Sequence, residues 1–459
     1  MVYAISIVAL IAIFTVATIT PINMGLLAFA GAFIVGGAIS GIPVEDVIDA
    51  FPGSTFIIVG GITLLFAIAK ANGTIDVVID RSLRLVGGRR WAILWMMFLL
   101  SGLLMALGSV LAVGMLAPIA MPLAKRNNIN PFLMGMVVSH GALACCFSPI
   151  NLYGAFVNGL MDSTGVGSHP LALFLIPFVL NTLIALVLFL VLGRDLIRDR
   201  TRAFDVQDLR DNEGGLPVPS GPRPGHTGLP EGSGGGTSVK VEVDHIESSS
   251  VTTVPNENVP LTRVRVLTLL GIAALVLLSV TLGVDIGVSA ICVSVVLLLL
   301  APKTHPKVVD NIAWPAVVLV CGVQTYMAVM TQNGTLGFLG DAASALGSPL
   351  LTALILCYAV AIISAFGSSI GTIGIALPLA APLLAAGELG AIGFVAAIAF
   401  SATVVDVSPF STNGVMVLAE ARVDDKARFQ RKMLGYCGLV VLIAPPTVWL
   451  LTVVAPSMT

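Results

Sequence analysis

Long apolar runs separated by short polar segments recur along the whole chain, and this pattern predicts an all-helical protein. A helix needs roughly 20 apolar residues to cross the hydrocarbon core of a bilayer. Ten predicted spans of this kind cover residues 3–20, 23–41, 54–71, 132–161, 169–193, 265–281, 285–302, 314–332, 391–419 and 433–455. Two further apolar stretches, 91–124 and 349–385, are too long for one crossing and short for two.

The composition agrees with a protein that crosses a membrane many times. Hydrophobic residues make up 57% of the 459 residues and charged residues only 10%, whereas soluble globular proteins carry about 25% charged residues. The first run lacks a basic segment and a small-residue cleavage site, so we interpret it as a first span rather than a signal peptide. The six cysteines lie in apolar runs without Cys-x-x-Cys spacing, which predicts neither a disulfide framework nor a transition-metal site.

One segment, residues 194–264, has a different composition from the rest of the chain. Its middle, GGLPVPSGPRPGHTGLPEGSGGGTS, is rich in glycine, proline and serine and has too few apolar residues to bury a core. The sequence therefore predicts two membrane-embedded halves, 1–193 and 265–459, joined by a disordered linker.

The two halves carry similar motifs in the same order. KANGTIDVVID at 70–80 resembles TQNGTLGFLGD at 331–341, and CCFSPINLYG at 145–154 resembles VDVSPFSTNG at 405–414. The first pair is offset by 261 residues and the second by 260. The prolines and one glycine of the long stretches follow the same register, with Pro118, Pro122 and Gly114 matching Pro378, Pro382 and Gly374. A nearly constant register over separate features predicts an internal repeat.

The basic residues predict how the chain is oriented in the membrane. Arginines at both ends of the linker indicate that the linker is cytoplasmic. If both long stretches return to the side that they leave, all 23 lysines and arginines lie on the cytoplasmic side. The outer loops then carry no basic residue but contain Glu45, Asp46, Asp49, Asp162, Asp285, Asp341 and Glu388. Both termini are predicted to lie outside the cell's inner membrane.

This threading gives each half five crossings and one stretch that does not cross. Because five is odd, we predict that the second half is inserted upside down relative to the first. We interpret 91–124 and 349–385 as re-entrant helical hairpins, although two short full spans in each place would give the same topology. Inverted repeats with such hairpins and with broken helices are typical of secondary transporters, whose binding sites lie near the middle of the bilayer.

Two polar motifs, SPINLYG at 148–154 and SPFSTNG at 408–414, each interrupt a predicted span near its middle. Proline removes a helical N–H group and glycine relaxes the backbone, so we predict that each helix stops and restarts there. The restarted half offers N–H groups and a positive dipole end to an anion, and the half that ends offers carbonyl groups to a cation. The alternative is a kinked helix whose polar residues are satisfied by its neighbours. The candidate residues are Ser148, Asn151, Ser408, Ser411, Thr412 and Asn413.

The turns of the two hairpins are predicted near LGSVLAVG at 107–114 and FGSSIGTIG at 366–374. Glycine and serine there would let the backbone approach a ligand closely, and the hydroxyl groups belong to Ser109, Ser368, Ser369 and Thr372. The alternative is close helix packing, because membrane helices use small residues at their interfaces in any case.

Ionisable side chains deep in the membrane are functional candidates by default, and the spans contain few of them. Asp406 lies at the second motif, where it would neutralise a cation or carry a proton. His140 lies about two helical turns before the first motif and titrates near neutral pH in water. Hydrogen bonding to backbone groups is the alternative role for both. No arginine lies in a span away from its inner end, so an anionic substrate would depend on helix N-termini, hydroxyls, amides and bound cations.

Several stretches resemble the bacterial malonate/C4-dicarboxylate carrier family, which belongs to the ion-transporter superfamily together with the divalent anion:sodium symporters. They are INMGLLAFAGAFIVGG, NGTIDVVIDRSLRLVGGR, FSPINLYGAFVN and VDVSPFSTNG. The resemblance implies Na⁺- or H⁺-coupled uptake of a small dicarboxylate, an elevator-type movement and a homodimer in the inner membrane. The hairpin turns lack the Ser-Asn-Thr that is typical of the sodium symporters, so the coupling cation is assigned only as Na⁺ or H⁺.

These considerations divide the candidate residues into two sets. We assign Ser109, Asn151, Ser368, Ser369, Thr412 and Asn413 to the substrate, and Ser148, Thr372, Asp406, Ser408, Ser411 and His140 to the cation, with Na⁺ sites at the two motifs. No cofactor and no nucleic-acid partner are predicted; the partners are the dicarboxylate and the lipid bilayer. The alternatives are an ion exchanger of the Na⁺/H⁺ or arsenite type, and an intramembrane hydrolase using a serine with His140. The hydrolase lacks the Gly-x-Ser-x-Gly context of a nucleophile.

Overall fold

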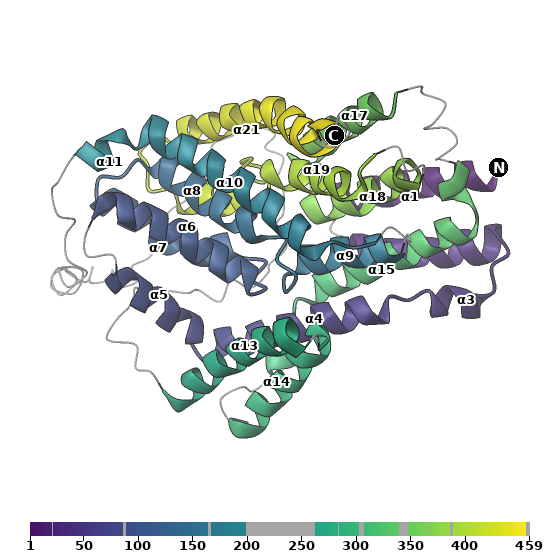
Figure 1. The fold of residues 1–459 in the computed structure, drawn as a ribbon, viewed down its shortest axis with the longest axis horizontal. Helices are drawn as coiled ribbons and strands as arrows, with labels where there is room; N and C mark the ends of the chain where they lie inside the picture. The colour runs from purple at the N-terminus through teal and green to yellow at the C-terminus, as the bar shows by residue number, and fades with distance from the viewer. Residues whose placement is uncertain are drawn as a thin grey trace, which may run out of the picture.

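The fold is described by a computed structural model. It covers residues 1–20, 22–85, 89–163, 167–198, 262–282, 284–302, 307–338, 348–366, 368–385 and 389–455. Within these ranges every regular element is a helix, which confirms the all-helical prediction (Figure 1). Most of the predicted linker lies outside the described residues, as do Asp341 and Glu388 of the predicted outer loops.

The helices follow the apolar runs closely. The first half contains α1 (Val2–Ile19), α2 (Met24–Gly31) continuing as η1 (Ala32–Ile39), α3 (Val44–Asp49), α4 (Gly53–Ala71), α5 (Thr74–Leu85), α6 (Arg90–Ala106), α7 (Ala112–Arg126), α8 (Pro131–Cys145), α9 (Leu152–Ser163), α10 (Pro170–Leu192) and α11 (Arg194–Arg198). The second half contains α13 (Arg263–Leu282), α14 (Ile286–Leu300), η3 (Val308–Asn311), α15 (Trp314–Gln332), α17 (Pro349–Ser364), α18 (Ser369–Ala385), α19 (Ala391–Val404), α20 (Thr412–Glu420), α21 (Lys426–Trp449) and η4 (Leu450–Val454).

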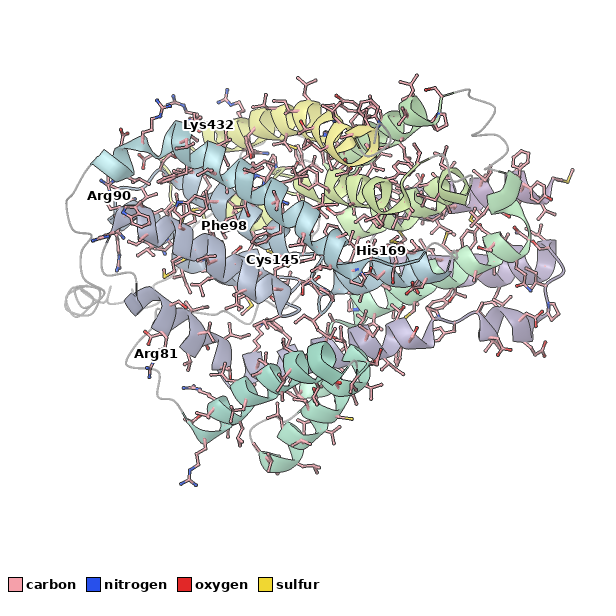
Figure 2. The ribbon with its side chains drawn as sticks, viewed as in Figure 1. Arg81, Arg90, Phe98, Cys145, His169 and Lys432 are labelled. Atoms are coloured by element: carbon pink, nitrogen blue, oxygen red, sulfur yellow. The ribbon has the colours of Figure 1, made fainter. Side chains whose placement is uncertain are left out.

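Several of these helices are suited to a bilayer by length and composition. The stretches Val44–Ala71, Pro170–Leu192, Trp314–Gln332 and Lys426–Val454 are long and apolar enough to cross a membrane on their own, and shorter apolar helices cover most of the other predicted spans. Arg81, Arg90 and Lys432 lie at one end of the molecule (Figure 2), and the N-terminus lies at the other (Figure 1).

Helices α1, α2, α4, α13, α14 and α15 pack together as a group that we call the framework. Its close contacts join the two halves of the chain. A Cβ atom at Gly25 on α2 would lie 2.0 Å from the Val318 carbonyl oxygen on α15, and one at Gly61 on α4 would lie 2.8 Å from the Gly287 carbonyl oxygen on α14. Glycine at these points lets the helix backbones touch.

We expect Gly61→Ala to lower the stability of the folded protein, because the added methyl group would collide with the Gly287 carbonyl. Overpacking of this kind costs about 1–3 kcal/mol. The matched control is Gly60→Ala on the same helix, where nothing lies within 4 Å of the added carbon. Thermal unfolding of the detergent-solubilised protein, followed by size-exclusion chromatography, measures the difference. Equal unfolding temperatures for the two variants would contradict the prediction.

The Asn-Gly-Thr motifs of the two halves also hold the framework together. Asn72, which follows α4, donates a hydrogen bond to the Thr268 hydroxyl on α13 at 2.7 Å. Asn333, which follows α15, donates to the Ser6 hydroxyl on α1 at 3.0 Å. In both motifs the threonine hydroxyl donates to the side-chain oxygen of the asparagine. Each motif therefore binds the first helix of the other half.

Helices α6–α10 and α17–α21 form a second group that we call the hairpin group, of which α9 also packs against framework helices α4 and α15. Figure 1 shows α8, α10 and α21 of this group away from framework helices α13 and α14. Helices α6 and α7 form one helical pair and α17 and α18 form the other. Arg90 Nε donates to the Asn127 carbonyl at 2.7 Å, which brings the two ends of the first pair together.

The turns of the helical pairs are shorter than the sequence predicted. The first tip consists of residues 107–111, because α7 already begins at Ala112. Because α18 begins at Ser369, the second tip consists of Ala365, Phe366 and Ser368, together with residue 367, which is not described. The sequence GTIG at 371–374, predicted as part of the turn, is helical.

Candidate functional site

Both polar motifs break their helices, as predicted. The first break, residues 146–151, separates α8 from α9, and the second break, residues 405–411, separates α19 from α20. The two loops are built in the same way. The Ser148 N–H donates to the Cys145 carbonyl at 3.1 Å, and the Ser408 N–H donates to the Val405 carbonyl at 3.0 Å.

A glycine closes each break by packing against the loop. A Cβ atom at Gly154 would lie 2.1 Å from the Ser148 carbonyl oxygen, and one at Gly414 would lie 1.8 Å from the Ser408 carbonyl oxygen. Both distances are far below van der Waals contact, so only glycine fits. The first turn of α9 and the first turn of α20 are thereby held against the polar loop, with their N-termini facing it.

The first tip is bound to the first break through Asn151, which is fully buried. Its side-chain nitrogen donates to the Met105 carbonyl at 2.5 Å, at the end of α6. Its side-chain oxygen accepts the Tyr153 N–H at 2.9 Å and thereby caps α9. One neutral amide therefore donates a hydrogen bond to the hairpin and accepts one from the N-terminus of α9.

The second tip is bound to the second break by different side chains. The buried Ser364 hydroxyl, at the end of α17, donates to the Ala402 carbonyl on α19 at 2.6 Å and lies 3.1 Å from the Ser369 hydroxyl. Phe366 of the tip stacks on Phe410 of the break with ring centroids 5.8 Å apart. Both rings are largely exposed. The buried part of this junction is therefore held by serine hydrogen bonds, and its two aromatic rings are exposed.

The two breaks meet each other through the returning arms of the opposite hairpins. A Cβ atom at Gly114 on α7 would lie 2.7 Å from the Met416 sulfur on α20, and one at Gly374 on α18 would lie 3.2 Å from the Phe156 ring on α9. The Asp406 carboxylate of the second break interacts electrostatically with Cys146 of the first break and with Tyr153 on α9. Two tips, two breaks and two half-helices therefore converge on one region.

Asp406 lies at the N-terminus of α20 and is 4% exposed. The Thr412 backbone N–H and the Ser411 hydroxyl lie near its carboxylate, and the Ser411 hydroxyl donates to the Ser408 carbonyl at 2.8 Å. The Asn413 side-chain nitrogen lies 3.3 Å from Oδ2 of Asp406. A negative charge is stabilised at a helix N-terminus, so a carboxylate lies at the start of α20, whereas a neutral amide caps α9.

The structure brings most of the predicted site residues into this region. Ser109 is buried in the first tip, where its hydroxyl faces the Met115 sulfur at 3.6 Å. Ser368 is exposed at the second tip, and Thr412 is exposed at the start of α20. The buried Thr372 hydroxyl, on α18, donates to the carbonyl of Ser368 in the second tip.

His140 stands apart from the breaks. It is fully buried on α8, where Nδ1 lies 2.9 Å from Asn181 Oδ1 on α10 and Nε2 lies 2.6 Å from the Tyr436 hydroxyl on α21. Asn181 donates its own amide to the Pro177 carbonyl, so its oxygen accepts and His140 Nδ1 carries the hydrogen. His140 thus joins three helices through hydrogen bonds at both of its ring nitrogens.

Two contributors to the region are not among the residues predicted from the sequence. The first is Ser364. Each helical pair has a serine in its first helix, Ser101 on α6 and Ser364 on α17, that donates to a backbone carbonyl of the neighbouring helix, Val138 on α8 and Ala402 on α19. The recurrence of a serine in both halves could have indicated this role from the sequence. Cys437 on α21 donates its thiol to the Val405 carbonyl at 3.7 Å and also contacts Ser408. Among the described residues, no three His, Cys, Asp or Glu side chains gather in a metal-binding arrangement.

Two family models match the chain. Residues 1–146 match the N-terminus of the dicarboxylate carrier protein MatC, and residues 273–457 match the citrate transporter family. The first match covers the framework helices of the first half, the first hairpin and α8, and the second covers most of the second half. No curated protein sequence matches the chain at a significant level.

Proposed function

Since the chain matches a dicarboxylate carrier model over residues 1–146 and a citrate transporter model over residues 273–457, we propose that it is a MatC-like carrier that imports a small dicarboxylate, malonate or a C4-dicarboxylate, together with Na⁺ or H⁺. Both matching families are transporters of dicarboxylates or citrate, so the protein is a multi-pass membrane transporter and not an enzyme. The substrate class within that range and the coupling to a cation are our proposal.

The observation that carries the proposal is the meeting of two half-helix N-termini at the hairpin tips. The N-termini of α9 and α20 each present backbone N–H groups and a positive dipole end, and a dicarboxylate has two anionic groups for two such positions. Asn151, Ser368, Ser369, Thr412 and Asn413, with Ser109, supply neutral hydroxyl and amide donors around them. No basic side chain is needed to bind the anion in this arrangement.

The cation is proposed to bind at the polar loops of the breaks. The ends of α8 and α19 supply carbonyl groups, and Ser148, Ser408 and Ser411 supply hydroxyl oxygens. Asp406 supplies the negative charge. Oxygen ligands of this kind suit Na⁺, and the carboxylate suits H⁺. His140 is bonded to Asn181 and Tyr436, so we propose that it supports α8 rather than carrying the cation.

The proposed movement follows from the division into two helix groups. The halves are proposed to be inverted repeats, because matched residues make matched contacts: Gly25 and Gly287, Asn72 and Asn333, and Gly114 and Gly374. The framework, through which two copies would form a homodimer, stays fixed. The hairpin group carries the substrate by an elevator-type displacement. The two helical pairs then act as re-entrant hairpins, in an inner membrane with the linker in the cytoplasm.

The test is uptake of labelled malonate into proteoliposomes that contain the full chain. Na⁺ and H⁺ gradients are imposed separately, and unlabelled succinate, malate and citrate serve as competitors. We expect accumulation under at least one gradient and competition by the dicarboxylates. The proposal fails if no dicarboxylate accumulates under either gradient, and Na⁺/H⁺ exchange by the same vesicles would then favour an ion exchanger.

A further inference from the structure

The two half-helices of the site are capped in chemically different ways. The N-terminus of α9 is capped by the neutral amide of Asn151, which accepts the Tyr153 N–H. At the N-terminus of α20 lies the carboxylate of Asp406, whose Oδ2 accepts the Asn413 amide at 3.3 Å close to the Thr412 N–H. A carboxylate of the protein therefore already fills one of the two positions that suit a carboxylate of the substrate.

No positive side chain offsets the charge of Asp406 in this region of the described structure. The titratable groups that interact with Asp406 are the thiols of Cys146 on the first break and Cys437 on α21, and the phenol of Tyr153 on α9. None of these groups carries positive charge. A second carboxylate brought to the N-terminus of α20 would therefore meet a like charge at short range in a buried site, where repulsion is poorly screened.

On the basis of the proposed function, we propose that Asp406 is a built-in competitor that occupies the binding position of one substrate carboxylate. The substrate enters when a coupling cation cancels the charge of Asp406, as a bound proton or as Na⁺; the Asn413 amide is then released to the substrate, and the neighbouring Thr412 N–H becomes available to it. Coupling then arises from competition for the same donors. The position at α9 has no charged competitor, because Asn151 is neutral, so the substrate's other carboxylate displaces no charge there.

The competition predicts how substitution of Asp406 changes the requirement for a cation. Asp406→Asn keeps the size and the acceptor but removes the charge, and Asp406→Ser leaves a smaller neutral acceptor. Both variants are expected to bind substrate equally well with or without a cation. Because the binding of the cation then no longer affects the binding of the substrate, both variants should exchange substrate across a membrane but fail to accumulate it against a gradient.

The experiment measures malonate binding to the purified full chain by isothermal titration calorimetry. The buffers are alkaline and sodium-free, alkaline with Na⁺, and acidic and sodium-free. For the unsubstituted protein we expect binding to tighten at least about tenfold in the Na⁺ buffer or in the acidic buffer, which identifies the cation. For Asp406→Asn and Asp406→Ser we expect the same affinity in all three buffers.

The matched control is Asp425→Asn, an exposed helix cap on α21 whose carboxylate accepts the Arg428 N–H at 2.8 Å. It should keep the cation dependence of the unsubstituted protein. The inference is overturned if the Asp406 variants keep that dependence, or if they elute as folded protein but no longer bind malonate. If the unsubstituted protein binds and accumulates no dicarboxylate in any condition, the proposed function itself fails.

Discussion

Gly414→Ala is expected to abolish transport, and Gly154→Ala is expected to do the same. In each case the added methyl carbon would lie about 2 Å from the carbonyl oxygen of the serine in the same loop. That oxygen cannot withdraw easily, since the Ser408 carbonyl accepts the Ser411 N–H at 3.1 Å and the Ser148 carbonyl accepts the Asn151 N–H at 2.8 Å. The strain, at the upper end of roughly 1–3 kcal/mol, would push the half-helix away from the break.

The effect on function should exceed the effect on folding, because the displaced element is the N-terminus that faces the substrate. Malonate uptake into proteoliposomes measures the effect on function, and the elution profile in detergent measures the effect on folding. The control is Gly435→Ala on α21, where nothing lies within 4 Å of the added carbon. Uptake by Gly414→Ala close to that of the control would show that the loop tolerates a side chain and that the tight packing is not needed.

The fold could be predicted from the sequence to the extent that single segments determine it. Apolar run length located most of the helices within a few residues, although α21 begins at Lys426 and not at 433, and proline with glycine located both breaks, because these properties act locally. The hairpin turns were predicted too long, since GTIG at 371–374 is helical. Glycine and small polar residues occur in turns and at close helix contacts alike, and only the packing of Gly374 against Phe156 distinguishes the two.

The site was harder to predict because its contacts join distant segments. The sequence identified Asp406 and Asn151, but not that Asn151 holds the first hairpin at Met105. His140 looked like a titrating group near the first motif. Its partners, Asn181 and Tyr436, lie 41 and 296 residues away, and nothing in the local sequence indicates that its ring faces them. The direction in which a helical side chain points follows from the packing of whole helices.

Asn151→Asp is expected to lower malonate uptake at neutral pH by at least about tenfold, the effect of losing ~1.4 kcal/mol. The asparagine donates to the Met105 carbonyl and accepts the Tyr153 N–H, whereas an ionised aspartate can only accept. It would remove one of the two donors to the Met105 carbonyl, which keeps the Gly108 N–H at 3.0 Å, and would set a negative charge against that oxygen. A lost hydrogen bond in a buried site costs about 1–3 kcal/mol. It would also place a carboxylate at the one half-helix that has a neutral cap.

A protonated aspartate regains a donor and mimics the amide, so the variant should recover as the pH falls. The uptake of Asn151→Asp, expressed relative to the unsubstituted protein at each pH, is expected to rise toward acidic pH. Asn151→Leu has neither donor nor acceptor and should stay inactive throughout. Asn130→Asp is the control, because Asn130 caps α8 by accepting the Phe132 N–H at an exposed site, where a charge is tolerated. If Asn151→Asp transports normally at neutral pH, a neutral cap on α9 is not required, and the difference between the two half-helices does not govern binding.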